Sequence, residues 1–411
     1  MMNTTPLEKY AQLVVKTGIN IQKDQTLVIT SPIECAPFAR VIAEVAYQAG
    51  AREVVMNWKD ELSSKIRFLQ APEEIFDEFP EWQKEFYLSY VRKGAAFVSI
   101  AASDPELLKE VNPDRVVRVQ KASNNALKEY RERLMSNKNA WCIVSIPTHS
   151  WAKKVFPEVS EGEAVEKLWE AILKAVRVDT DDPVAAWQEH SKALKKNMNH
   201  LNTRNFKVLH YKNSLGTDLK VELPEGHIWL GGPEHTAGGI EFVANMPTEE
   251  VFTLPKKTGV NGTVVSSKPL NYNGTLIDNF SLTFKDGRIV DFKADQGYEV
   301  LKKLVETDEG SHYLGEVALV PYNSPISNSN ILFYNTLFDE NASCHFAIGK
   351  AYPICIEKGV SMNTGELEQA GVNDSIVHVD FMIGTADLEI TGITATGESL
   401  TVFKNGNFNL E

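Results

Sequence analysis

"TLVITSPIECAPFARVIAEVAYQAG", residues 26–50, joins a short apolar run to a longer amphipathic pattern. The run TLVIT (26–30) is rich in β-branched residues and lacks polar alternation, which is typical of a strand buried on both faces of a parallel sheet. The apolar residues that follow have the spacing of an amphipathic helix, and Gly50 is a helix-ending residue. The stretch therefore predicts one strand followed by one helix.

The rest of the first half repeats this unit. Further apolar runs of the same kind are EVVMNW (53–58), AAFVSIA (95–101) and WCIVSIP (141–147). Helical patterns separate these runs, and two more helical stretches follow at 162–178 and 183–202. Residues 1–200 are therefore predicted to form an α/β domain with an open, mostly parallel sheet. The first strand-to-helix turn has no G-x-G-x-x-G, so we expect no dinucleotide cofactor there.

The sequence changes in character after about residue 205, where short alternating segments are separated by Gly, Asn and Asp. KDGRI (285–289) is a strong hairpin signal, because Asp-Gly tolerates the positive φ angles of a tight turn. One helix is expected at 296–310. Residues 201–411 are therefore predicted to form a β-rich α+β domain of largely antiparallel strands, with the domain boundary near residue 200.

The excess of acidic residues lies in the second half of the chain. Residues 1–200 hold 27 Lys and Arg against 28 Asp and Glu, whereas residues 201–411 hold 15 against 27, for a net charge of −13 overall. Such a surface repels phosphate backbones, so we expect no nucleic-acid partner. Solubility explains most of this charge, but carboxylates gathered to hold cations would contribute in the same direction.

The sequence has no signal for export or membrane insertion. The N-terminus lacks a basic region followed by an apolar core, and no uncharged apolar run of about 18 residues occurs, so we expect no membrane partner. No C-x-x-C pair is formed by the four cysteines Cys35, Cys142, Cys344 and Cys355. So few cysteines, without a C-x-x-C pair, fit a reducing compartment better than a disulfide framework, and we expect a cytoplasmic protein.

The segment SIVHVDFMIG (375–384) is an apolar strand pattern that carries an imidazole and a carboxylate. His378 and Asp380 are two positions apart, so in a strand they point to the same face, about 6.6 Å from each other. They could therefore bind one metal ion from the same side. About one such His-x-acid triplet is also expected by chance in a chain with nine His and 55 acids, so the pair alone does not establish a site.

Other ionisable residues of the second half also stand beside apolar or small neighbours. They are Glu249 and Glu250 in NMPTEEVFTLP, Glu316 in LGEVALVP, and His345 and Tyr352 in DENASCHFAIGKAYP. Each has an ordinary alternative: a solvated turn residue, an ion pair with a lysine, a hydrogen-bonded buried histidine or a core tyrosine. Taken together with the His-x-acid pair, they supply the mixed nitrogen and oxygen donors that divalent first-row metals prefer. A set this rich in carboxylates favours two ions over one.

Two ions about 3.5–4 Å apart that share a carboxylate are typical of hydrolytic chemistry. The other common hydrolase patterns are absent, because the sequence has no G-x-S-x-G, no cysteine-protease signature and no H-E-x-x-H. Two alternatives remain open. One is a hydrolase with two metal ions that acts on a different amide, such as a dipeptidase or an amidohydrolase, and the other is a binding module with a structural calcium ion. Calcium prefers oxygen donors, so the two imidazoles argue against the module.

Three segments resemble a known family: NMPTEEVFTLP (245–255), the long block 314–353, and NDSIVHVDFMIG (373–384). They are similar to the thermophilic-type metallo-aminopeptidases, peptidase family M29, which includes the bacterial aminopeptidases S and T. GINIQKDQTLVI and AYQAGAREVVMNW resemble the first domain of that family. The resemblance implies a two-domain subunit, an active site in the second domain, and removal of the N-terminal residue from short peptides with a free amine.

The resemblance also implies the roles of individual residues and a cofactor. The metal ligands would be Glu250, Glu316, His345, His378 and Asp380. Tyr352 falls beside the metals. Adjacent residues of a strand point to opposite faces, so we expect Glu250 rather than Glu249 to reach the ions, and Glu249 to be either a neighbour of the ligands or a general base. The expected cofactor is two divalent cations per subunit, zinc or cobalt, with manganese and magnesium as alternatives. A homodimer is the expected assembly.

Overall fold

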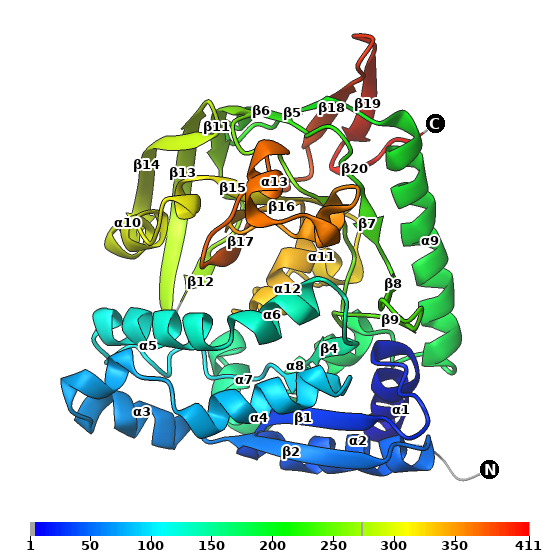
Figure 1. Ribbon diagram of the computed structural model, residues 1–411, viewed down its shortest axis with the longest axis vertical. Helices are drawn as coiled ribbons and strands as arrows, with labels where there is room; N and C mark the ends of the chain where they lie inside the picture. Colours follow the sequence, from blue (N-terminus) through cyan, green and yellow to red (C-terminus); the bar gives the residue numbers. More distant parts are fainter. Residues whose placement is uncertain (1–4, 273, 411) are drawn as a thin grey trace. The chain divides into compact units, whose positions relative to one another are not determined.

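The computed structural model describes residues 5–272 and 274–410 (Figure 1). The chain divides into two compact units. Unit 1 comprises the described residues up to His190 together with 233–248 and 332–337, and unit 2 comprises 191–232, 249–331 and 338–410. The domain boundary near residue 200 stays a prediction.

Unit 1 contains a four-stranded sheet whose neighbouring strands are all parallel. The strand order is β2-β1-β3-β4, with β1 at Thr26–Pro32, β2 at Glu53–Lys59, β3 at Ala96–Ile100 and β4 at Trp141–Val144. The predicted α/β region with a parallel sheet is thus confirmed. One detail of the prediction is wrong: β2 is not buried on both faces, because it forms an edge of the sheet and its residues are half-buried or exposed.

Helices connect these strands, as the sequence pattern predicts. The first, α2, spans Ala36–Gln48 and is followed by Gly50 at a φ of 101°. The other helices of the first half are α1 (Pro6–Leu13), α3 (Glu61–Gln70), α4 (Glu81–Arg92), α5 (Pro113–Ala126), α6 (Lys128–Met135), α7 (His149–Val155), α8 (Glu161–Ala175) and α9 (Pro183–Arg204). No helix in the described part of the chain is long and apolar enough to cross a bilayer.

Unit 2 is built from two sheets whose paired strands are antiparallel, which confirms the β-rich prediction. The larger sheet has nine strands: β5 (Val208–Lys212), β6 (Asp218–Glu222), β11 (Val260–Val265), β12 (Leu270–Tyr272), β13 (Thr275–Lys285), β14 (Arg288–Gln296), β18 (Glu389–Ile393), β19 (Ser399–Lys404) and β20 (Asn407–Phe408). The smaller sheet has the order β17-β16-β15-β10-β7, with β17 at His378–Met382, β16 at His345–Gly349, β15 at Leu314–Leu319, β10 at Val251–Thr253 and β7 at Leu230–Gly231.

The helices in the second half are short. The expected helix at 296–310 forms as α10, over Tyr298–Val305. Three further helices were not predicted: α11 (Pro325–Ser329), α12 (Thr336–Asp339) and α13 (Thr364–Gln369). With four to six residues each, they are too short to show the periodicity that marks a helix in a sequence.

The hydrophobic core of unit 2 joins its two sheets. Phe346 of β16 and Phe381 of β17 are fully buried in one cluster with residues of the large sheet. The ring of Phe346 lies 5.0 Å from that of Tyr211, and the ring of Phe381 lies 5.6 Å from that of Phe280. One face of the five-stranded sheet is therefore anchored by aromatic packing, and its other face is available for polar groups.

We expect the turn between β13 and β14 to tolerate only glycine at position 287. Asp286 and Gly287 have φ angles of 50° and 82°, as a two-residue hairpin turn requires. In Gly287→Ala the new methyl group would overlap the backbone oxygen of Lys257, in addition to a conformational cost of about 1–2 kcal/mol. Thermal unfolding should show a clear decrease in Tm.

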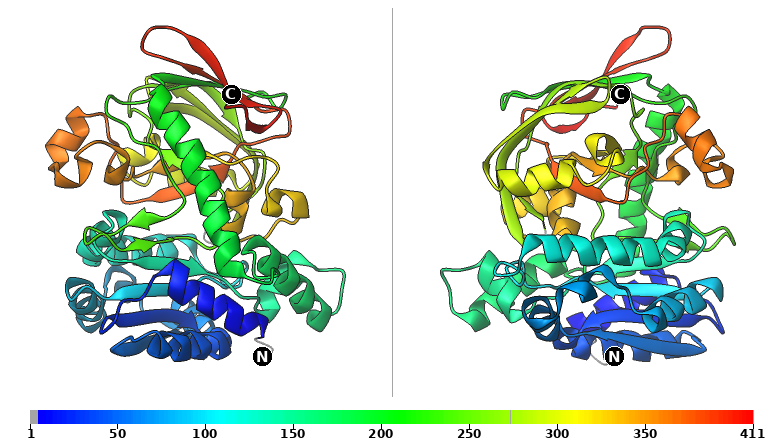
Figure 2. Two further views of the ribbon diagram at one scale, coloured as in Figure 1. Left: turned by 90° about the vertical axis from the view of Figure 1, so that its right-hand side faces the viewer. Right: turned by 60° about the vertical axis from the view of Figure 1, so that its left-hand side comes forward.

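The matched control is Gly397→Ala, in the loop between β18 and β19, a hairpin that projects at one end of the large sheet (Figure 2). Gly397 also has a positive φ, of 85°, but no atom of the residues that the structure describes lies within 4 Å of an added methyl group. Gly397→Ala should therefore be destabilised only by the conformational cost. Equal decreases in Tm for the two variants would contradict the steric argument.

Candidate metal centre

The five-stranded sheet aligns two of the predicted ligands in one row. Glu316 on β15 lies opposite Ala347 on β16, and Ala347 lies opposite Asp380 on β17. Residues directly opposite each other in antiparallel strands project from the same face. The carboxylates of Glu316 and Asp380 therefore lie on one face of the sheet, on either side of the methyl group of Ala347.

The two histidines occupy the same face. His345 and Gly349 are at even distances from Ala347 along β16, so their positions share its face. His378 lies opposite Gly349. The four side chains therefore project from the same face of the sheet.

Glu250 lies just before the first residue of the next strand, β10. It directly precedes Val251, and Phe252 lies opposite Ala318 of β15. By the same alternation, Glu250 projects on the face that carries Glu316. Its side chain is 11% exposed.

A β-bulge at Gly315 gives Glu316 its direction. Leu314 pairs with Ile348, but Glu316 pairs with Ala347, so β15 contains one extra residue. In a regular strand Leu314 and Glu316 would share a face, whereas here Leu314 is in the hydrophobic core and Glu316 faces the histidines. An added methyl group at Gly315 would overlap the backbone oxygens of Lys350 and Gly349, so the close approach requires glycine.

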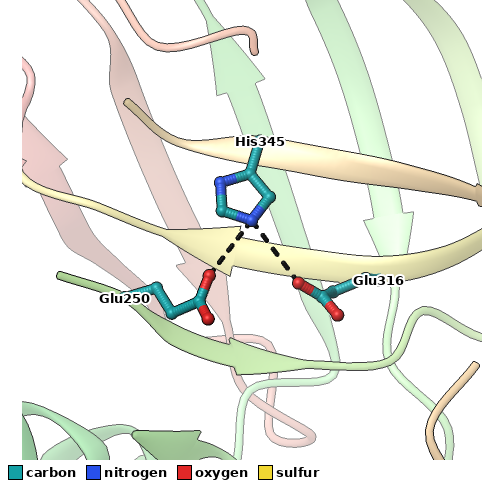
Figure 3. A group of neighbouring side chains, drawn as sticks. All are labelled: Glu250, Glu316 and His345. Atoms are coloured by element: carbon teal, nitrogen blue, oxygen red, sulfur yellow. Dashed lines mark ion pairs between the residues drawn. The ribbon is translucent and has the colours of Figure 1, made fainter. Parts of the chain in front are cut away.

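The five side chains form two groups that share Glu316. In the first, the Nε2 of His345 lies 3.1 Å from Glu250 Oε2 and 3.5 Å from Glu316 Oε1 (Figure 3). In the second, the Nε2 of His378 lies 3.5 Å from Glu316 Oε2 and 3.4 Å from Asp380 Oδ1. Within each group, one donor atom from every residue lies within 4.8 Å of the others, which is close enough to hold one ion.

Backbone carbonyls orient both imidazoles. The Nδ1 of His345 lies 3.1 Å from the carbonyl oxygen of Ser343, and the Nδ1 of His378 lies 2.7 Å from that of Lys350. Because a carbonyl only accepts, each Nδ1 carries the donated hydrogen and each Nε2 faces the carboxylates. This is the arrangement that histidine ligands adopt in metal sites.

The charges of the site are strongly coupled. Burial alone would lower the pKa of His345, but the Glu250 and Glu316 carboxylates outweigh it and hold that pKa well above its ordinary value. In the same way, Asp380 and Glu316 outweigh burial and raise the pKa of His378 to about 9. Burial raises the pKa of Glu316 itself. In the metal-free chain the imidazoles are therefore protonated at neutral pH and partly balance the carboxylates.

The donor set fits divalent metal ions. Among the described residues, no Lys or Arg pairs with any of the five side chains. The Oδ1 of Asp380 is buried and makes no hydrogen bond to any described residue. Three carboxylates and two imidazoles without a basic partner leave buried negative charge, which a divalent cation would neutralise.

The comparison with known proteins agrees with this chemistry. The family model for the thermophilic metalloproteases (M29) matches residues 3–408. The chain belongs to the M29 metalloprotease family. This M29 chain is 52% identical over 405 residues to aminopeptidase 2 of Geobacillus stearothermophilus, and 52% identical over 402 residues to aminopeptidase AmpS of Bacillus subtilis. Each match covers 98% of both proteins.

The M29 chain also resembles a solved structure. Its similarity to wild-type AmpT from Thermus thermophilus has a TM-score of 0.91 at 40% identity, and covers 98% of this chain and 99% of that one. The family membership makes the M29 chain a metal-dependent peptide hydrolase.

Two predicted residues of the M29 chain lie beside the two groups without belonging to them. The ring of Tyr352 lies 4.9 Å from that of His378, at an interplanar angle of 70°. Glu249 is 4% exposed, and its backbone N–H donates to the Oδ1 of Asn341. The group around His345 contains Glu250 and not its neighbour Glu249.

The sequence pattern did not single out Glu340. It begins the short 3-10 turn η5 (Glu340–Ala342) and is 9% exposed. Burial, and then the charges of Asp380 and Glu250, raise its pKa well above the ordinary value, so its carboxylate belongs to the same electrostatic system. Glu340 lies five residues before His345, a spacing that corresponds to no metal motif, and only the fold brings it to the site.

We expect the metal-free protein to lose stability as the pH rises from about 6.5 to about 9. The folded chain raises the pKa of His378 from 6.5 to about 9. The stabilisation is therefore fully present below the unfolded pKa and is lost as the pH passes the folded one. Thermal unfolding of the metal-free protein across this range measures the effect, and metal affinity should rise over the same range because binding displaces the proton.

The control is the variant His378→Asn, in which the dependence on pH should be smaller. Metal-loaded protein provides a second control, since its imidazole has no proton to lose. Metal-free wild-type protein whose Tm follows the same pH profile as His378→Asn would contradict the assignment.

Proposed function

We propose that this chain is an aminopeptidase that uses two divalent cations to remove the N-terminal residue from peptides with a free α-amine. The observation that carries the proposal is the pair of ligand groups that share Glu316, whose two oxygens face different imidazoles. A carboxylate in that position is suited to bridge two ions. The names of the relatives, aminopeptidase 2 and aminopeptidase AmpS, support the choice of substrate.

The first ion would be held by Glu250, Glu316 and His345, and the second by Glu316, His378 and Asp380. Bound there, two divalent cations would activate a shared water, polarise the scissile carbonyl and anchor the free amine of the substrate. Oxygen and imidazole donors without a thiolate suit zinc or cobalt, with manganese and magnesium as alternatives.

Tyr352 would stabilise the negative charge that develops on the scissile carbonyl oxygen. Burial raises the pKa of its hydroxyl well above the ordinary value, and neighbouring carboxylates contribute in the same direction. The hydroxyl therefore keeps its proton throughout the working range and can donate a hydrogen bond to an oxyanion.

A proton must also move from the attacking water to the leaving amine. Two buried carboxylates, Glu249 and Glu340, adjoin the ligand groups without belonging to either. We assign the proton transfer to this pair. A raised pKa suits Glu340 to hold a proton near neutral pH, and Glu249 directly precedes a ligand in the sequence.

We further propose that the protein acts on short peptides as a homodimer in the cytoplasm. This part of the proposal follows from the family resemblance and from the cysteine content, since the chain has only four cysteines and no C-x-x-C pair. Its oligomeric state can be measured by light scattering coupled to size-exclusion chromatography.

The central test is hydrolysis of leucine p-nitroanilide compared with its N-acetylated form. We expect cleavage of the free amine only, loss of activity with EDTA, and recovery on addition of zinc or cobalt. Glu316→Gln and His345→Ala should each lose activity by at least about 100-fold, because loss of a direct ligand should cost more than loss of a supporting residue.

His210→Gln is the matched control, because His210 also pairs with a carboxylate, that of Asp218, 2.6 Å away, but lies outside both ligand groups. It should retain activity. Cleavage of the acetylated substrate would indicate a different amide hydrolase. Full activity in protein shown by elemental analysis to be metal-free would overturn the proposal.

Tyr352→Phe separates the chemical step from metal binding. The variant keeps the ring that packs against His378 and Phe252 and loses only the hydroxyl. We expect kcat to fall by roughly 10²–10³-fold, with the metal content unchanged. Unchanged kcat would remove Tyr352 from the mechanism, and loss of metal would assign it to metal binding instead.

A further inference from the structure

Asn341 is a fully buried polar residue next to the metal centre. It lies in the turn η5, directly after Glu340, and its exposed fraction is 0%. Its Oδ1 accepts a hydrogen bond from the backbone N–H of Glu249 at 2.7 Å. The bond joins two segments 92 residues apart in the sequence, each of which carries a carboxylate of the site.

The contacts determine the orientation of the Asn341 amide. A backbone N–H is only a donor, so the oxygen of the amide must face Glu249. The Nδ2 group is then directed to the other side, where it donates to Oε1 of Glu340 at the longer distance of 3.4 Å. The amide thus spans the space between the Glu249 backbone and the Glu340 carboxylate.

The hydrogen bond from the Glu249 N–H to Asn341 holds residues that lie outside the strand pairing of β10. β10 begins at Val251, which pairs with Leu319, so Glu249 and Glu250 precede the ladder. Glu249 is 4% exposed, and a buried N–H needs a partner. Without the Asn341 oxygen, this backbone would have to shift toward another acceptor and would displace the Glu250 carboxylate with it.

We propose that Asn341 is a positioning residue that holds Glu250 in place for the first of the two ions. The proposal rests on the two-ion function proposed above. It has a selective consequence, because Glu250 belongs to the group around His345 and not to the group around His378. Loss of the Asn341 oxygen should therefore weaken the binding of one ion more than that of the other.

The test is calorimetric titration of metal-free protein with Zn²⁺ for the wild type and for Asn341→Leu, which has the same branched shape and no acceptor. We expect two binding events in the wild type. In the variant, one of the two dissociation constants should increase by roughly 10–100-fold, as is usual when a residue that supports a ligand is lost, and the other should change much less.

Asn139→Leu is the matched control. Asn139 is 2% exposed and its amide donates two hydrogen bonds, to the carbonyl oxygens of Val91 and Ala95, in unit 1. This variant should lower Tm while leaving both dissociation constants unchanged. A general loss of stability would therefore not be mistaken for a loss of positioning.

The outcomes distinguish the two proposals. Wild-type protein that binds no Zn²⁺ overturns the proposed function itself. If the wild type shows two binding events and both Zn²⁺ dissociation constants are unchanged in Asn341→Leu, the role of Asn341 is overturned. An equal loss of Zn²⁺ affinity in Asn139→Leu overturns it as well. If Asn341→Leu does not fold, hydrogen exchange of the Glu249 amide in metal-free wild-type protein decides: protection supports the bond, and exchange at the rate of an exposed amide overturns it.

Discussion

The carboxylate of Glu316 lies between two imidazoles, and the rest of the site is arranged around it. One oxygen faces His345 and the other faces His378, at 3.5 Å in each case. A buried carboxylate is costly without a partner, and in the metal-free chain two cationic imidazoles offset this cost. In the proposed function, metal ions would take over this role. This shared group joins the five residues into two candidate ligand groups.

The five-stranded sheet supplies the geometry for this interaction. The register places Glu316, Ala347 and Asp380 in one row, with only the methyl group of Ala347 between the two carboxylates. The opposite face of the sheet is held by Phe346 and Phe381 in the core of unit 2. Rigid packing on one face thus orients the polar groups on the other, as a preorganised site requires.

A large part of the fold follows from local sequence patterns. The four apolar runs of the first half form parallel strands, and the Asp286-Gly287 turn forms the hairpin that its sequence predicts. These signals are strong because apolar periodicity and positive φ angles depend on neighbouring residues alone. The short helices α11, α12 and α13 were missed because one turn of helix has no measurable period, and the half-exposed β2 was misjudged because a sequence does not show which strand lies at an edge.

The sequence by itself determined the residue types of the candidate site, the same-face relation of His378 and Asp380, and the family. The tertiary structure decided which distant carboxylates meet. It brought Glu250 and not Glu249 into the group with His345, and it added Glu340 to the electrostatic system and Asn341 to the support of the site. The physical reason is that strand register, the bulge at Gly315 and a hydrogen bond across 92 residues depend on long-range packing, which no local pattern encodes.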